Sequence, residues 1–190
     1  LGWWWHTPED TLDKLDPALM LRDAQIYVLV TQRVLEDAVL PLDYRAAVAE
    51  ARGILQSYQK AAKGRFDLAP ALSQLEALGK SLRPLYRRIR AGGFTPAATH
   101  RVNRCLVALA RELIPVNYCR AERFEHDATL AVPPFPALEP MQQLGTLPRK
   151  SDEARKLCVG LVRGRNKVCY HLRRAVAQVE ATLAALPRRC

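Results

Sequence analysis

The chain has 190 residues, of which 49% are hydrophobic and 25% are charged, and its formal net charge is +10 at pH 7. This length and apolar content argue against intrinsic disorder and are sufficient for a buried core. No run of about 18 apolar residues occurs, so a membrane-spanning helix is not expected. The charge is uneven: residues 1–16 carry −3, so the remainder carries +13, a surface that would attract polyanions.

The acidic start of the chain combines three tryptophans with one histidine. Thr7, Pro8 and Asp10 have the spacing of a capping box, in which a Thr hydroxyl accepts from the third helical N–H and an acid reaches back. We therefore expect a short helix over residues 8–15, directly after His6. From composition alone His6 is simply the residue before a helix, because one histidine does not make a metal site.

Caps and apolar periodicity predict five longer helices in the rest of the chain. Asp16 and Thr95 are each followed by proline, the pattern of an N-cap and a first helical position. Apolar residues then recur three and four positions apart, so that each helix has an apolar face. The expected helices, caps included, span residues 16–39, 43–62, 67–90, 95–115 and 151–186. The sequence thus predicts an all-α, mostly antiparallel helical bundle.

Residues 115–150 interrupt this pattern before the last helix. Five prolines between residues 133 and 148 exclude a long helix and favour extended or turn conformations. A segment of this length inside a compact domain is either packed on the bundle or functional. We refer to it as the strap, and we expect Phe124, Phe135 and Leu138 to anchor it to the helices.

Three short motifs resemble segments of one enzyme family. Trp5-His6-Thr7 with Asp10-Thr11 resembles the His-Thr-x-x-Asp-Thr closing motif of the co-catalytic zinc exopeptidases, which include bacterial aminopeptidases, glutamate carboxypeptidase II and the transferrin receptor. Residues 39–45 resemble a junction in the helical domain of these proteins, and residues 122–127 resemble an Arg-aromatic-x-His segment. The motifs occur in the family's order with similar spacing, so the resemblance covers most of the chain.

The resemblance implies a division of the chain and a role for one histidine. Residues 1–16 would be the C-terminal remnant of a zinc peptidase catalytic domain, and residues 17–190 a transferrin-receptor-like helical dimerisation domain. By resemblance His6 would be a zinc ligand in the parent enzyme. The other ligands of a two-metal site precede the closing motif in this family, so we expect the chain alone to hold no cofactor and to be inactive.

The resemblance also implies partners, namely a second copy of the chain and its own upstream catalytic domain. In glutamate carboxypeptidase II the comparable strap helps to shape the substrate pocket. Residues 131–136 do not reproduce that pocket, so specificity for glutamate is not implied. Members of the family are often extracytoplasmic, and the sequence itself leaves the compartment open.

Two other function classes compete with this interpretation. The +13 segment is compatible with a basic helical module that binds nucleic acid or an anionic membrane surface, although its basic residues alternate with apolar stripe positions. The second class is a self-sufficient hydrolase, for which the chain lacks recognisable metal ligands, since His100, His126 and His171 stand on separate elements.

The five cysteines have no paired Cys-x-x-Cys spacing, which excludes a zinc ribbon. Cys158 and Cys169 are expected to be small buried helix residues.

Overall fold

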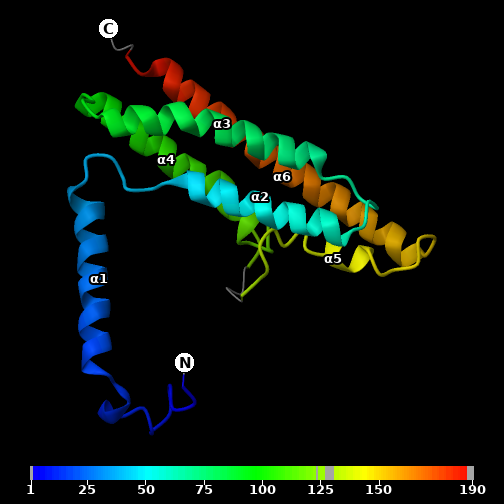
Figure 1. The fold of residues 1–190 in the computed structure, drawn as a ribbon, viewed down its shortest axis with the longest axis horizontal. Coiled ribbons are helices and arrows are strands. Elements are labelled where there is room, and N and C mark those ends of the chain that lie inside the picture. The colour runs from blue at the N-terminus through cyan, green and yellow to red at the C-terminus, as the bar shows by residue number, and fades with distance from the viewer. Residues whose placement is uncertain (1, 123, 127–130, 188–190) are drawn as a thin grey trace. The chain divides into compact units, whose positions relative to one another are not determined.

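The computed structural model describes residues 2–122, 124–126 and 131–187, and within these residues every regular element is a helix (Figure 1). The all-α class predicted from the sequence is therefore confirmed. The chain divides into two compact units, Leu1–Pro41 and Leu42–Cys190, a later boundary than the one suggested after residue 16. The helices are η1 (Leu12–Lys14, a 3-10 turn), α1 (Pro17–Glu36), α2 (Tyr44–Ala61), α3 (Ala69–Ala91), α4 (Pro96–Asn117), α5 (Met141–Leu144) and α6 (Asp152–Ala185).

The predicted caps start the long helices. The Asp16 carboxylate accepts from Ala18 N at 2.8 Å, and the Thr95 hydroxyl accepts from Ala98 N at 3.3 Å. The Ser151 hydroxyl accepts from the N–H of Ala154 at 3.1 Å. These side chains satisfy amide groups that have no carbonyl partner at a helix start. Three of the predicted helix beginnings are thereby confirmed.

Two local predictions are wrong. Residues 8–15 do not form a helix, because the Thr7 hydroxyl accepts from Glu9 N at 3.2 Å and donates to Trp4 O at 2.6 Å, which makes a turn in place of a capping box. Only η1 is helical there. Pro115 does not end α4, which continues to Asn117. A proline removes one helical hydrogen bond and leaves the others intact, so packing of Val116, which is 3% exposed, is enough to continue the helix.

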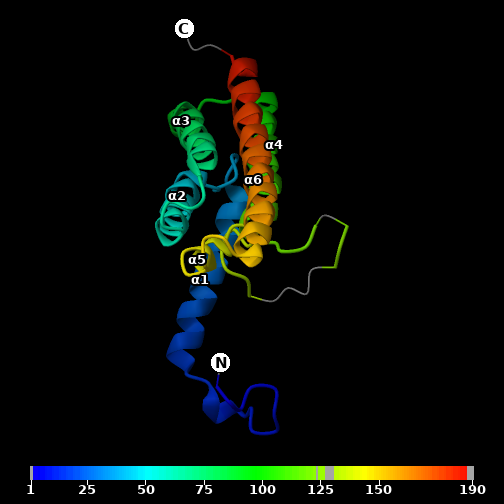
Figure 2. The same cartoon turned by 90° about the vertical axis from the view of Figure 1, so that its right-hand side faces the viewer.

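The second unit is a bundle organised around α6. Helix α6 packs against both α3 and α4, while α2 packs against α3 and the short α5. Figure 2 shows α4 beside α6 and α2 with α3 in the neighbouring layer. In Figure 1 α4 runs antiparallel to α6, whereas α3 runs parallel to it. The core side chains are spaced three and four apart, as the apolar periodicity predicted: Leu55, Leu75, Leu78, Leu82, Leu85, Leu106, Leu109, Leu161, Val168, Leu172 and Val179 are almost fully buried.

Two tyrosines connect the start of α2 to the other helices. The Tyr86 hydroxyl donates to Leu42 O at 2.7 Å and accepts from Tyr44 N at 2.9 Å. The Tyr44 hydroxyl donates to the carbonyl of Leu106 on α4 at 2.8 Å. Burial raises the pKa of Tyr86 to about 12. These bonds hold α2, α3 and α4 in register where the second unit begins.

The strap is fastened to the bundle through its backbone as well as its side chains. Phe135 and Leu138 are 2% and 0% exposed, so the predicted anchoring is found at both. The Tyr58 hydroxyl donates to Pro134 O at 2.7 Å, and the Arg65 guanidinium donates to Leu144 O and, at 2.6 Å, to Leu147 O. Phe124 is not an anchor, because it sits in a turn closed by the Glu125 N–H and Glu122 O and is 93% exposed.

The first unit contains a helix, α1, whose side chains are not packed into a core. No residue of α1 is buried, although half of its length consists of large apolar side chains. Within the described residues no helix is sufficiently long and apolar to cross a membrane. The apolar face predicted for α1 therefore exists but is uncovered in this unit. Its exposed apolar side chains are Leu19, Met20, Leu21, Ile26, Tyr27, Val28, Leu29, Val30, Val34 and Leu35.

Candidate association surface

The exposed apolar side chains of the second unit are concentrated on two of its helices. Apart from Leu42 and Phe124, which lie outside helices, all of them stand on α4 or α6, or at the α4 C-cap. Among the residues that the structure describes, α2 and α3 contribute none. We call this set the α4–α6 outer surface. It consists of Val107, Ile114 and Tyr118 from α4 and its cap, and Val159, Val162 and Tyr170 from α6.

Helical periodicity explains this placement. Residues seven and eleven positions apart lie on the same side of an α-helix, so Val107, Ile114 and Tyr118 form one stripe. The buried residues Val102 and Leu109 lie on the opposite side of α4. Burial of the inner stripe against α6 thus turns a second apolar stripe toward solvent. Contiguous exposed apolar patches of several hundred Å² can mark association sites, and this stripe is a candidate for such a site.

A polar cluster joins the two helices that carry this surface. Glu112 on α4 accepts from the Arg174 guanidinium and contacts His171 Nδ1, each at 2.8 Å. The Arg174 guanidinium also lies 5.5 Å from the centroid of the Tyr170 ring. The Glu112 side chain is only 14% exposed, so its two partners compensate for much of its lost hydration. The cluster therefore fixes α4 to α6 and orients one aromatic ring of the outer surface.

Four arginines lie close together on α2 and α3. Arg45, Arg83, Arg87 and Arg90 line a hollow of about 190 Å³. Asp43 pairs with Arg45, and this guanidinium lowers the pKa of the Asp43 carboxyl. The other three arginines make no hydrogen bond or ion pair with a described residue. The bundle thus carries its exposed large apolar side chains on α4 and α6, whereas basic side chains occur on all four of its long helices.

His6, the residue predicted to be a zinc ligand in the parent, lies in an exposed turn. It has a positive φ of 61°, and its ring stacks on Trp5 with 3.8 Å between centroids. The backbone N–H of His6 donates to Asp10 Oδ2 at 3.4 Å. Within the described residues no three His, Cys, Asp or Glu side chains gather in a metal-binding group. A catalytic zinc ion takes three protein ligands, so the residues present do not complete a zinc site around His6.

The remaining predicted residues are distributed as follows. Arg123 and Asp127 of the third motif lie outside the described residues, as does Cys190. Cys105, Cys119, Cys158 and Cys169 are free thiols, and Cys169 is buried as expected whereas Cys158 is half-buried. Sequence reasoning missed the α4–α6 outer surface. Its signal was present as apolar residues outside the inner stripes, at positions 107, 114, 159 and 170.

Comparison with known proteins adds no assignment: no family model, no curated protein and no solved structure matches this chain.

Proposed function

We propose that residues 42–190 are the helical dimerisation domain of a zinc-dependent exopeptidase, and that two protomers pair through the α4–α6 outer surface. The observation that carries this proposal is the restriction of exposed apolar side chains to α4 and α6 among the helices of the bundle. The resemblance of three ordered motifs to the zinc exopeptidases supports the enzyme class. In such an assembly the strap of each protomer would lie near a catalytic cleft and help to shape it.

A two-fold pairing suits the chemistry of this surface. In a symmetric interface the same patch meets itself, so apolar stripes pair with apolar stripes. Full burial of a large apolar side chain contributes about 1.5–3 kcal/mol, and aromatic residues such as Tyr118 and Tyr170 are frequent interface anchors. The chain carries a net charge of +10, so electrostatics oppose the pairing of two copies. We therefore expect an apolar dimer that salt does not dissociate.

We assign the first unit to the catalytic part of the same enzyme. Five of its polar side chains follow one stripe of α1, namely Arg22, Gln25, Gln32, Arg33 and Glu36, and apolar side chains together with Asp23 and Thr31 occupy the remaining circumference. A helix that is apolar on most sides is normally buried in a larger domain. The upstream catalytic domain is the partner that would cover α1, and His6 would supply its zinc ligand there.

The proposal is tested by the solution mass of charged variants of the full chain. Ile114→Glu introduces a charge on the α4–α6 outer surface, where Ile114 is 46% exposed, and should give a monomer by light scattering. Gln56→Glu on the exposed side of α2 adds the same charge elsewhere and should leave the dimer intact. Tyr27→Glu on α1 shows which of the two units forms the dimer interface. Loss of the dimer in this variant alone would assign pairing to α1 and contradict the proposal.

The basic face of α2 and α3 supports a second candidate function, a module that binds nucleic acid or an anionic membrane surface. Arg83, Arg87 and Arg90 form no ion pair with a described residue, although Arg90 lowers the pKa of Asp43 and Arg83 that of Glu76 through their charge. Such binding would weaken steeply with salt, because neutralised phosphates release their counterions. Tight binding of duplex DNA or phosphatidylserine vesicles by the wild type, lost on Arg87→Ala with the dimer intact, would favour this function.

A further inference from the structure

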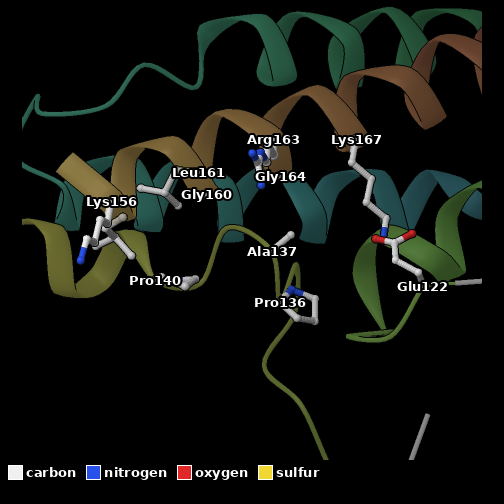
Figure 3. Close-up of a pocket in the computed structure, with 11 residues that line it drawn as sticks. Glu122, Pro136, Ala137, Pro140, Lys156, Gly160, Leu161, Arg163, Gly164 and Lys167 are labelled. Carbon is white, nitrogen blue, oxygen red and sulfur yellow. The ribbon is translucent and has the colours of Figure 1, made fainter. Parts of the chain in front are cut away.

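A hollow of about 420 Å³ lies between the strap and α6. Figure 3 shows the strap passing below α6, and Pro136, Ala137 and Pro140 of the strap line the hollow. On the helix side, Lys156, Gly160, Gly164 and Lys167 follow one stripe at intervals of three and four residues. The hollow has the size of a site for a small organic molecule.

Two glycines of α6 meet the strap in different ways. At Gly164 a Cβ atom would lie 2.5 Å from Ala137 O, so close packing of the strap explains this glycine. At Gly160, one turn earlier, a Cβ atom would meet nothing within 4 Å. A helical glycine costs about 1 kcal/mol relative to alanine, and no packing contact accounts for it at position 160. Gly160 therefore leaves helix backbone accessible from the hollow.

The hollow combines an apolar floor with positive charge. Leu161 is 1% exposed, and Pro136 and Pro140 of the strap also line the hollow. Lys167 pairs with Glu122 at 2.8 Å and closes one end. Lys156 and Arg163 line the hollow without a hydrogen bond or ion pair to any described residue. An apolar floor with unpaired cations at its edge is complementary to a molecule that has an apolar body and one carboxylate.

We propose that the hollow between the strap and α6 binds a small carboxylate with an apolar body. The apolar body lies against Leu161, Pro136 and Pro140, and it occupies the space left by the missing side chain of Gly160. The carboxylate pairs with Arg163 and Lys156. A peptide C-terminus with an apolar last residue and a short acyl carboxylate share this chemistry. This binding site is independent of the proposed role as the dimerisation domain of a zinc exopeptidase.

Titration of the ¹⁵N-labelled full chain tests the site, with the amide signals of Gly160 and Gly164 as reporters and that of Gly53 as the reference. N-acetyl-leucine represents the peptide C-terminus, octanoate represents the acyl carboxylate, and N-acetyl-leucinamide lacks the charge. We expect saturable shifts at both reporter glycines for at least one carboxylate, with a Kd of about 1 mM. The amide should bind about tenfold more weakly, because it forms no ion pair.

Matched variants identify where binding occurs. Gly160→Leu fills the hollow and should abolish the shift at Gly164, whereas Gly53→Leu, where a Cβ also meets nothing within 4 Å, should preserve it. Arg163→Gln should weaken carboxylate binding about tenfold and leave thermal stability unchanged. The proposal is overturned if no carboxylate gives a saturable shift up to about 20 mM, if acid and amide bind equally, or if Gly160→Leu binds like wild type.

Discussion

Replacing each of two glycines in α6 by alanine tests how closely the strap packs. A Cβ at Gly164 would stand 2.5 Å from Ala137 O, whereas ordinary van der Waals contact begins at 3.4 Å. The strap backbone cannot easily retreat by this difference, because Phe135 N donates to Asn117 O at 3.2 Å and Leu138 is fully buried. Gly164→Ala therefore forces either the strap or α6 to shift.

The expected energies have opposite signs at the two positions. Alanine is better than glycine in a helix by about 1 kcal/mol, and Gly160→Ala should gain this amount because its Cβ meets nothing within 4 Å. At Gly164 the same gain is opposed by overpacking, which costs about 1–3 kcal/mol. Gly164→Ala should thus be neutral or destabilising, and it should be less stable than Gly160→Ala by about 1–3 kcal/mol.

Urea unfolding of both variants, followed by circular dichroism, measures this difference in the free energy of unfolding. The slope of the transition should stay constant, because both variants expose the same surface on unfolding. Equal stabilisation by both alanines would refute the reasoning, since it would show that the strap does not press on α6 at Gly164.

Two further predictions concern the contacts that hold α2, α3 and the strap together. Burial raises the pKa of Tyr86 from 10.0 to about 12, so the unfolded chain loses the phenolic proton first, and the free energy of unfolding should fall as the pH rises from about 10 to about 12. Tyr86→Phe should flatten that fall and cost about 1–3 kcal/mol at pH 7, and an unchanged pH slope in urea titrations would contradict the assignment. Arg65→Met removes the donor to two strap carbonyls, Leu144 O and Leu147 O, and should cost about 2 kcal/mol. It should also speed amide hydrogen exchange in residues 141–147, and protection equal to wild type would show that these bonds do not hold the strap.

The helices were predictable because their signals are local. A cap side chain and a following proline act within one turn, so Asp16-Pro17 and Thr95-Pro96 are sufficient to place two helix starts. The inner stripe of α6 follows from spacing alone. The turn at Thr7 was not predictable in this way, because the Thr7 hydroxyl can accept from the Glu9 N–H, which makes a turn, or from the Asp10 N–H, which makes a helix cap.

The surface features depend on contacts between distant residues, which the sequence pattern does not contain. Val116 packs well enough to carry α4 past Pro115, and Phe124 remains exposed although it is as apolar as Phe135. The exposed apolar stripe through Ile114 can be identified only when the inner stripe of α4 is known to pack against other helices. Pairing of Glu112 on α4 with His171 and Arg174 on α6 likewise requires the fold.

The mass of the full chain in solution tests the central claim most directly. Size exclusion with light scattering at about 50 mM and about 1 M salt separates apolar from electrostatic association, because high salt screens charges and strengthens apolar burial. We predict a dimer, with twice the chain mass of 21.4 kDa, at both salt concentrations. A monomer at both would contradict the claim that this helical domain pairs two protomers.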